Sequence, residues 1–228
     1  MKRQGFARVT PGIGPNVGEE ELRQLWADGD ASIKGTLVKG LYVEPLDSYS
    51  DTFDAQSCAY ENARFEGCIF DHVDFSDSTF ADVEFRSCCF IACEMSRSWL
   101  NRVDFASCSA PGISFEKGRL TGVSVADSQM SYANLSECSV IGLRVRSTNL
   151  SEASFARAKL LKLELADVDL TRAAFHGAPL GGVDLSECRI AGIGLSANLR
   201  EIRGAIIDET QAIDLMGYLG VKIRGYEQ

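Results

Sequence analysis

The chain has 228 residues, of which 45% are hydrophobic and 24% charged, with five prolines and a net charge of −9. This composition supports a sizeable core and excludes a disordered chain, and the negative charge argues against a general nucleic-acid binder. No run approaches the ~18 apolar residues of a membrane span, and the N-terminus has no apolar signal region. We therefore expect a cytoplasmic protein that neither binds nucleic acid directly nor enters a membrane.

Residues 1–30 are expected to be an N-terminal extension with one short helix. The helix is predicted within GEEELRQLWADGD, which begins at Gly18, because acidic residues fill the first turn. Leu22, Leu25 and Trp26 give this helix one apolar face.

Residues 31–57 are expected to form a cap coil followed by a loop. Ile33, Val38 and Val43 recur at every fifth position, but they are out of frame with the longer pattern that follows. The change of frame predicts a slip or loop at about residues 44–57.

From Phe65 to Leu195 the chain repeats at every fifth position. Of the 27 positions in this frame, 26 are Phe, Leu, Ile, Val or Met, and only Ala110 departs. The residue two positions before each of them is mostly small or β-branched. Neither a helix nor a strand has a period of five, so the pattern predicts another backbone that repeats.

This pattern resembles the pentapeptide-repeat family, whose motif is a small residue, any residue, Leu or Phe, and two further residues. ANLSE, ASFAR and AAFHG, which begin at Ala133, Ala153 and Ala173, are near-consensus copies. The resemblance implies an all-β fold, a right-handed quadrilateral β-helix over residues 58–198, in which each repeat forms one side. Four repeats make one coil, about seven coils in all.

In such a β-helix, two repeats that are four apart lie one above the other on the same side. The phenylalanines of the frame are therefore expected to stack in the core. The predicted core stack is Phe65, Phe70, Phe75, Phe80, Phe85, Phe90, Phe105, Phe115, Phe155 and Phe175.

Eight cysteines show neither a CxxC pair nor histidines at metal-ligand spacing, which favours free thiols over a zinc site or disulfides. Cys68, Cys88 and Cys108 occupy the small inward position of every fourth repeat, so they are expected to form a buried column. Cys89 falls at an outward position.

Residues 199–228 are expected to cap the coil, with a helix from about Asp208 to Tyr218 and a stop at Gly220. The ending RGAII…QA…LGVKI resembles the C-terminal segment of Qnr-type quinolone-resistance proteins, where it caps the coil and forms a dimer. Capping alone would need the same apolar face, so both interpretations stay open. The candidate cap or dimer residues are Ile206, Ile207, Leu215, Met216, Leu219, Val221 and Ile223.

The sequence carries no sign of catalysis. There is no nucleophile elbow, P-loop or dinucleotide motif, and His72 and His176 both fall at outward positions. A convex rod is expected to offer no pocket, so we predict no enzyme activity, no catalytic residue, no metal and no cofactor.

Two outward surfaces stand out when residues are sorted by side. The acidic face comprises the outward residues 64, 66 and 67 and their equivalents in every later coil. Its acids are Glu66, Glu84, Asp104, Asp127, Glu164, Asp167, Asp184 and Glu187. The apolar–basic face comprises outward residues 79, 81 and 82 and their equivalents. Its candidate residues are Trp99, Arg119, Ile141, Lys159, Leu161 and Lys162.

These faces predict a non-catalytic rod that binds a protein. The resemblance to Qnr-type proteins implies a DNA mimic that binds DNA gyrase or topoisomerase IV and protects it from quinolones. However, Arg144 and Arg146 interrupt the acidic face, and the frame has no inserted loops after residue 58. The alternative is a structural or adaptor module for another protein partner.

The exposed apolar strip of Trp99, Ile141 and Leu161 needs a cover. A partner could supply it. The N-terminal extension, residues 1–30 with Phe6, Leu22 and Trp26, is the cover that the sequence favours slightly.

Overall fold

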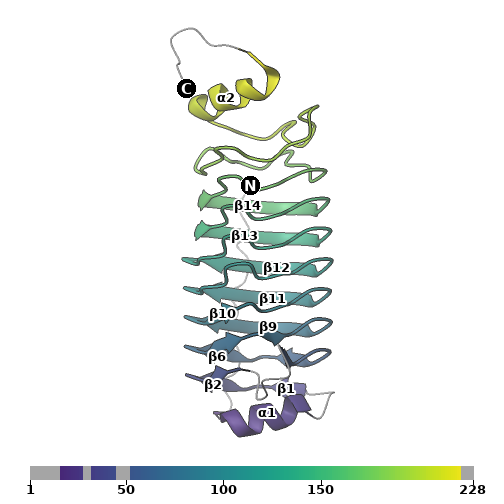
Figure 1. Cartoon of the computed structure of the whole chain (residues 1–228), viewed down its shortest axis with the longest axis vertical. Helices are drawn as coiled ribbons and strands as arrows, with labels where there is room; N and C mark the ends of the chain where they lie inside the picture. Colours follow the sequence, from purple (N-terminus) through teal and green to yellow (C-terminus); the bar gives the residue numbers. More distant parts are fainter. Residues whose placement is uncertain (1–15, 28–31, 45–51, 222–228) are drawn as a thin grey trace, which may run out of the picture.

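A computed structural model describes residues 16–27, 32–44 and 52–221. In it the chain winds into a straight rod of stacked coils with a helix at each end (Figure 1). The predicted β-helix is confirmed. No helix within the described ranges is long and apolar enough to cross a membrane.

The rod is built from short parallel strands. They are β1 (Ser32–Lys34), β2 (Leu37–Lys39), β3 (Tyr42–Val43), β4 (Phe53–Asp54), β5 (Ala59–Glu61), β6 (Arg64–Glu66), β7 (Ile69–Asp71), β8 (Val73–Asp74), β9 (Thr79–Arg86), β10 (Cys89–Ile91), β11 (Trp99–Ala106), β12 (Arg119–Ala126), β13 (Ser139–Asn149) and β14 (Lys159–Asp169). The main sheet runs β1-β5-β9-β11-β12-β13-β14, and from β5 onward each strand pairs with the equivalent strand of the next coil. Each coil therefore satisfies the backbone groups of the next.

A corner follows each side, because the backbone turns to positive φ two positions after each core residue. Asp77 (φ 60°), Asp82 (φ 56°) and Gly122 (φ 64°) are examples from three corners. Many of these corners carry residues other than glycine, which cost free energy in the left-handed region. Hydrogen bonds to the next coil, such as Asp77 N–H to the Ser96 carbonyl, hold them there.

The interior is a column of stacked side chains. The rings of Phe65 and Phe85 stack with centroids 5.1 Å apart, and those of Phe85 and Phe105 with centroids 5.0 Å apart. All ten phenylalanines of the predicted stack are buried. Small residues fill the space beside them, since a tube this narrow has no room for two large residues on one side.

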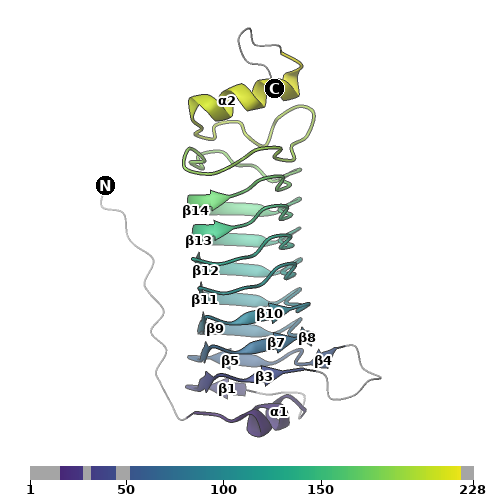
Figure 2. The same cartoon turned by 60° about the vertical axis from the view of Figure 1, so that its left-hand side comes forward.

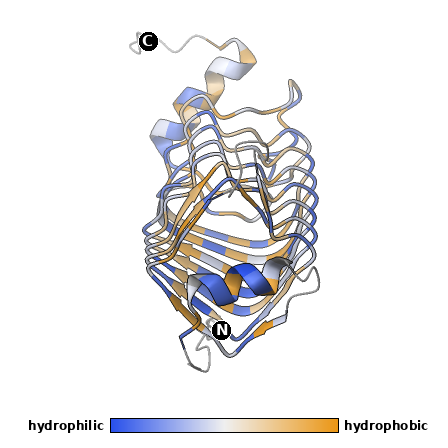
Figure 3. Cartoon of the chain, turned by 60° about the horizontal axis from the view of Figure 1, so that its bottom comes forward, coloured by the Kyte–Doolittle hydropathy of each residue, from blue (hydrophilic) through white to orange (hydrophobic). Residues whose placement is uncertain are grey.

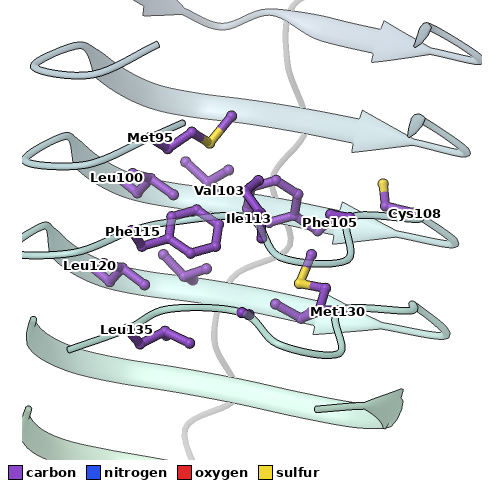
Figure 4. Close-up of a cluster of buried hydrophobic side chains, with 14 of the residues drawn as sticks. Met95, Leu100, Val103, Phe105, Cys108, Ile113, Phe115, Leu120, Met130 and Leu135 are labelled. Atoms are coloured by element: carbon purple, nitrogen blue, oxygen red, sulfur yellow. The ribbon is translucent and has the colours of Figure 1, made fainter. Parts of the chain in front are cut away.

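The aromatic column is interrupted in the middle of the rod. Figure 4 shows this region, where aliphatic and Met side chains meet Phe105 and Phe115. An apolar cavity of about 20 Å³ lies in this region, and Phe105, Phe115 and Val145 are among the residues that line it.

At the N-terminal end the register of the coils changes. Phe53 pairs with Val73 at the regular spacing of one coil, whereas Val38 pairs with Phe65, which lies further along the chain than that spacing allows. Additional residues thus enter the chain between Val43 and Phe53. Helix α1 (Glu19–Ala27) lies across this end of the rod (Figure 3).

At the C-terminal end a last, irregular turn is added. The Ile206 backbone pairs with Asp184, so this turn is slightly longer than a regular coil, and helix α2 (Glu209–Met216) then lies across the end (Figure 2). Asp208 caps α2 by accepting the N–H of Gln211, and the Gln211 side chain accepts the N–H of Asp208 in return. A 3₁₀ turn (Gly217–Leu219) follows and ends at Gly220 (φ 69°), the stop that the sequence predicts.

Candidate functional site

The candidate sites of this molecule lie on its outer faces and ends, because apolar side chains pack most of the interior. Within the described part of the chain, no three His, Cys, Asp or Glu side chains are grouped so that they could hold a metal ion. All eight cysteines are free thiols, and seven are buried. Cys89 is half-buried at its outward position, on strand β10.

The acidic face is partly neutralised by its own arginines. Glu84 is buried between Arg64, 2.7 Å away, and Arg86, 2.5 Å away. In the upper coils, those nearer the C-terminal end of the rod, Arg144 pairs with Glu164 at 3.1 Å. These pairs leave fewer unpaired carboxylates on this face than the eight acids that the sequence places there.

Ion pairs between successive coils recur around the rod. Arg97 binds Asp77 at 2.6 Å, and Arg102 binds Asp82 at 2.5 Å, in each case one coil away. The hydrogen-bonding Arg97 side chain holds the pKa of Asp77 below its usual value, and Arg102 does the same for Asp82. The spacing of acid and base by one coil was visible in the sequence, and it is the signal that would have revealed this pairing.

The acids that keep their charge unpaired gather toward the C-terminal half of the acidic face. Asp127, Asp167, Asp184 and Glu187 are exposed and have no ion pair within the described residues. Glu66, by contrast, pairs with Lys39 at 3.2 Å. The predicted site is therefore split into a compensated lower part and a more acidic upper part.

The remaining member of the acidic face lies between these two parts. Asp104 is half-buried on β11, where it is flanked in the ladder by Glu84 on β9 and Ser124 on β12. It therefore sits directly above the carboxylate that Arg64 and Arg86 compensate.

The structure places the residues of the apolar–basic face on neighbouring strands. Ile141 and Leu161 are direct neighbours on β13 and β14, and they are 45% and 61% exposed. Trp99, on β11, is 44% exposed. Arg119 lies beside Trp99 in the ladder, and Lys159 lies two coils beyond Arg119.

The expectation that the N-terminal extension covers this apolar strip is wrong for the residues that the structure describes. Leu22 and Trp26 pack at the N-terminal end of the rod instead. The Trp26 indole N–H donates to the Tyr60 hydroxyl at 2.7 Å, and its ring meets that of Phe53 edge-on. Without these side chains the N-terminal end of the rod would expose its aromatic core, which is why they pack there. Phe6 lies outside the described residues.

At the C-terminal end, some of the candidate residues are buried in the cap and others are exposed. Leu215 is buried, and Ile207 and Met216 are half-buried. Gln211 adds to the cap by donating to the Leu185 and Cys188 carbonyls, both at 2.7 Å. Ile206, Leu219 and Val221 are exposed, whereas Ile223 lies outside the described residues. Dimerisation through this end stays a prediction.

A groove between the last coil and α2 corrects the expectation that the rod has no hollow. It measures about 470 Å³ and is lined by Ile190, Ala191, Gly192, Asp214, Leu215, Gly217 and Tyr218. The Tyr218 hydroxyl donates to the Ile193 carbonyl. The sequence reasoning missed this hollow because it treated the end as a flat cap.

Glu201 is a second feature that the repeat could not reveal. Its buried carboxylate accepts the Gly177 N–H at 2.9 Å, the Ser196 N–H and the Ser196 hydroxyl. Burial raises the pKa of Glu201, but these donors outweigh it and hold the pKa at about 2. Glu201 therefore serves as an internal cap for the last turn of the coil.

Comparison with known proteins adds to this geometry. A family model of the pentapeptide repeat region matches residues 54–135, and a model of eight pentapeptide repeats matches residues 148–186. Together they cover more than half of the chain. No curated protein matches the sequence.

The solved structures with a similar fold include those of QnrB1 and HetL. A trypsin-treated variant of QnrB1, a plasmid-mediated fluoroquinolone resistance protein, is 19% identical, with a TM-score of 0.45, and the match covers 82% of this chain and 97% of that one. HetL is a pentapeptide repeat protein involved in heterocyst differentiation regulation, from the cyanobacterium Nostoc sp. strain PCC 7120. It is 17% identical, with a TM-score of 0.35, and the match covers 86% of this chain and 98% of HetL. These likenesses concern the fold alone.

Proposed function

Because the chain belongs to the pentapeptide-repeat family, we propose that it is a non-catalytic rod that binds a protein partner through its outer faces. The observation that carries this proposal is the in-register stacking of outward side chains. Pairing of successive coils places Ile141 beside Leu161 and Arg144 beside Glu164, so each side presents a surface of fixed chemistry. Apolar side chains pack the interior of the described coils, and the cavity in their middle measures about 20 Å³.

Rigid stacked coils suit binding better than catalysis. Catalysis needs convergent groups in a water-excluding site, whereas binding needs a preorganised surface that loses little entropy on association. The ion pairs between coils, such as Arg97 with Asp77, add fixed charge positions to that surface.

The proposal is tested with the purified chain immobilised and exposed to native extract. We expect one protein to be retained in stoichiometric amount and released by salt or by a charge-reversal variant on a single face. The proposal is contradicted if the column retains no more protein than a control column that carries an unrelated acidic protein.

A second candidate function is binding to DNA gyrase or topoisomerase IV by mimicry of DNA. What favours it is the group of unpaired acids Asp167, Asp184 and Glu187 on successive coils, together with the resemblance to Qnr-type proteins. Against it, Glu84 is buried and paired on both sides, and Glu164 is paired with Arg144. This function therefore requires the upper part of the acidic face.

Gyrase supercoiling measured with and without a fluoroquinolone tests this second candidate. If it holds, the protein inhibits or protects gyrase, and Glu164→Lys with Asp167→Lys abolishes the effect, which also weakens with salt. Glu20→Lys with Glu21→Lys on α1 is the control with the same change in charge. An effect equal in both double variants, or none in the wild type, removes this candidate.

A further inference from the structure

One part of the apolar–basic face is cationic on a chain of net charge −9. The side segments of its successive coils read WLNR (99–102), RLTG (119–122), SVIG (139–142) and KLLK (159–162), without one acid. Arg119, Lys159 and Lys162 are exposed and make no ion pair with any described residue. Many other cations of the described residues are paired with an acid one coil away, as Arg97, Arg157 and Arg172 are.

The same area carries an uncovered strip of large apolar side chains. Ile141 and Leu161 adjoin across β13 and β14, and Lys159 lies two positions from Leu161 on the same outward face of β14. An apolar centre with a cationic rim is the usual composition of a surface that another protein covers.

We propose that Trp99, Arg119, Ile141, Lys159, Leu161 and Lys162 form a docking surface for an acidic protein segment that presents an apolar side chain between two carboxylates. This inference rests on the proposed function, that the rod binds protein, and it names the chemistry of the partner. The carboxylates would pair with the free cations while the apolar side chain covers Ile141 and Leu161.

The spacing of the cations fits a helical segment that lies along the rod. Arg119 and Lys159 are two coils apart, about 10 Å at the usual strand spacing. Two carboxylates at positions i and i+7 of a helix are separated by about 10.5 Å, and the residue at i+4 between them faces the same way. Such a segment can engage both cations and the apolar centre together.

Other occupants fit less well. Residues 1–15 carry Lys2, Arg3 and Arg8 and no acid, so their charge repels this surface. A nucleic acid would meet few free cations here, and its row of phosphates offers no apolar side chain to cover Ile141 and Leu161. A second copy of this surface would place like charges together.

The test uses an alanine-based helical peptide of about 15 residues with glutamates at i and i+7 and leucines between them. Emission of Trp99 reports binding, because iodide reaches exposed Trp99 and not Trp26, which is buried. We expect saturable protection of Trp99 from iodide and an affinity that falls at least about tenfold in Arg119→Glu with Lys159→Glu. Arg200→Glu with Arg203→Glu, at exposed positions on the last turn, is the control with the same change in charge and should bind as the wild type does.

The result that overturns the inference is no saturable protection, equal affinity in both double variants, or equal binding of a peptide with lysines in place of the glutamates. Tighter protection of Trp99 by oligodeoxythymidine or by vesicles of phosphatidylserine also overturns it. Any of these results leaves the proposed function standing if the immobilised chain still retains a protein that a variant on another face releases. If the immobilised chain retains nothing at all, the proposed function fails instead.

Discussion

At the scale of single residues, the stacked phenylalanines hold successive coils together. Phe85 is 1% exposed, and its ring stacks on both Phe65 and Phe105. Neighbouring coils are tied by backbone hydrogen bonds, so they cannot close around a missing ring. A single side chain thus stabilises three coils at once.

Phe85→Ala is therefore expected to lower the free energy of unfolding by about 3–5 kcal/mol, through lost burial and the remaining cavity. Urea denaturation measures this change, and Tyr132→Ala at an exposed position is the control, with an effect within about 0.5 kcal/mol. A loss below about 1 kcal/mol for Phe85→Ala is incompatible with its place in the stack.

Thiol reactivity tests the inward and outward assignment of the same frame. Burial raises the pKa of Cys93 to about 12, and the neighbouring Cys108 and Cys68 thiols raise that of Cys88 together with burial. We expect alkylation of the native protein at neutral pH to modify Cys89 and spare the seven buried thiols. Mass spectrometry of the digested protein reads this directly, and comparable labelling of Cys88 and Cys89 contradicts it.

At the scale of elements, the coils are regular in the middle of the rod and rely on particular polar groups at its ends. The sequence predicts the coils because each repeat has the same inward pattern, and Ile33, Val38 and Val43 reveal the change of register. Nothing repeats around Glu201 or Gln211, and each also binds a residue on an earlier turn of the coil, so their roles need the structure. For the same reason the sequence could not place Trp26 at the end of the coil rather than on its side.

The small cavity in the central coils gives a prediction about packing. Val145→Ile adds one methylene toward that cavity, so it should raise the free energy of unfolding by up to about 0.8 kcal/mol. Val140→Ile, at a buried core position that does not line the cavity, should lower it instead by overpacking. Calorimetric melting of both variants measures the difference, and destabilisation of both alike shows that the cavity cannot accept the added group.

Glu201 should make the C-terminal end sensitive to acid. Its folded pKa of about 2 lies below the ordinary value of 4.5, so its contribution is fully present above pH 4.5 and is lost as the pH falls toward 2. Glu201→Gln should cost about 1.5–3 kcal/mol at about pH 7, because charge-assisted hydrogen bonds are lost. In urea titrations the gap between wild type and variant should narrow below pH 4.5, and a gap independent of pH rules out this role.

At the scale of the whole molecule, the repeat is a scaffold that fixes four outer surfaces. The sequence predicts the two candidate faces because a five-residue frame assigns every side chain to a side. It overstates the acidity of one face, since Glu84 is buried by its arginines and Glu164 is paired. It also cannot identify a partner, because complementarity depends on a surface in another molecule.

The most direct test of binding through an outer face is a photo-crosslinking scan in living cells, with one crosslinking residue on each side. Leu161, Asp167, Tyr132 and Arg157 are outward positions on the four sides. We predict a discrete crosslink to one protein from one side or two adjacent sides, which charge reversal on that side abolishes. No discrete product from any side, or the same products at equal yield from all four, contradicts the account.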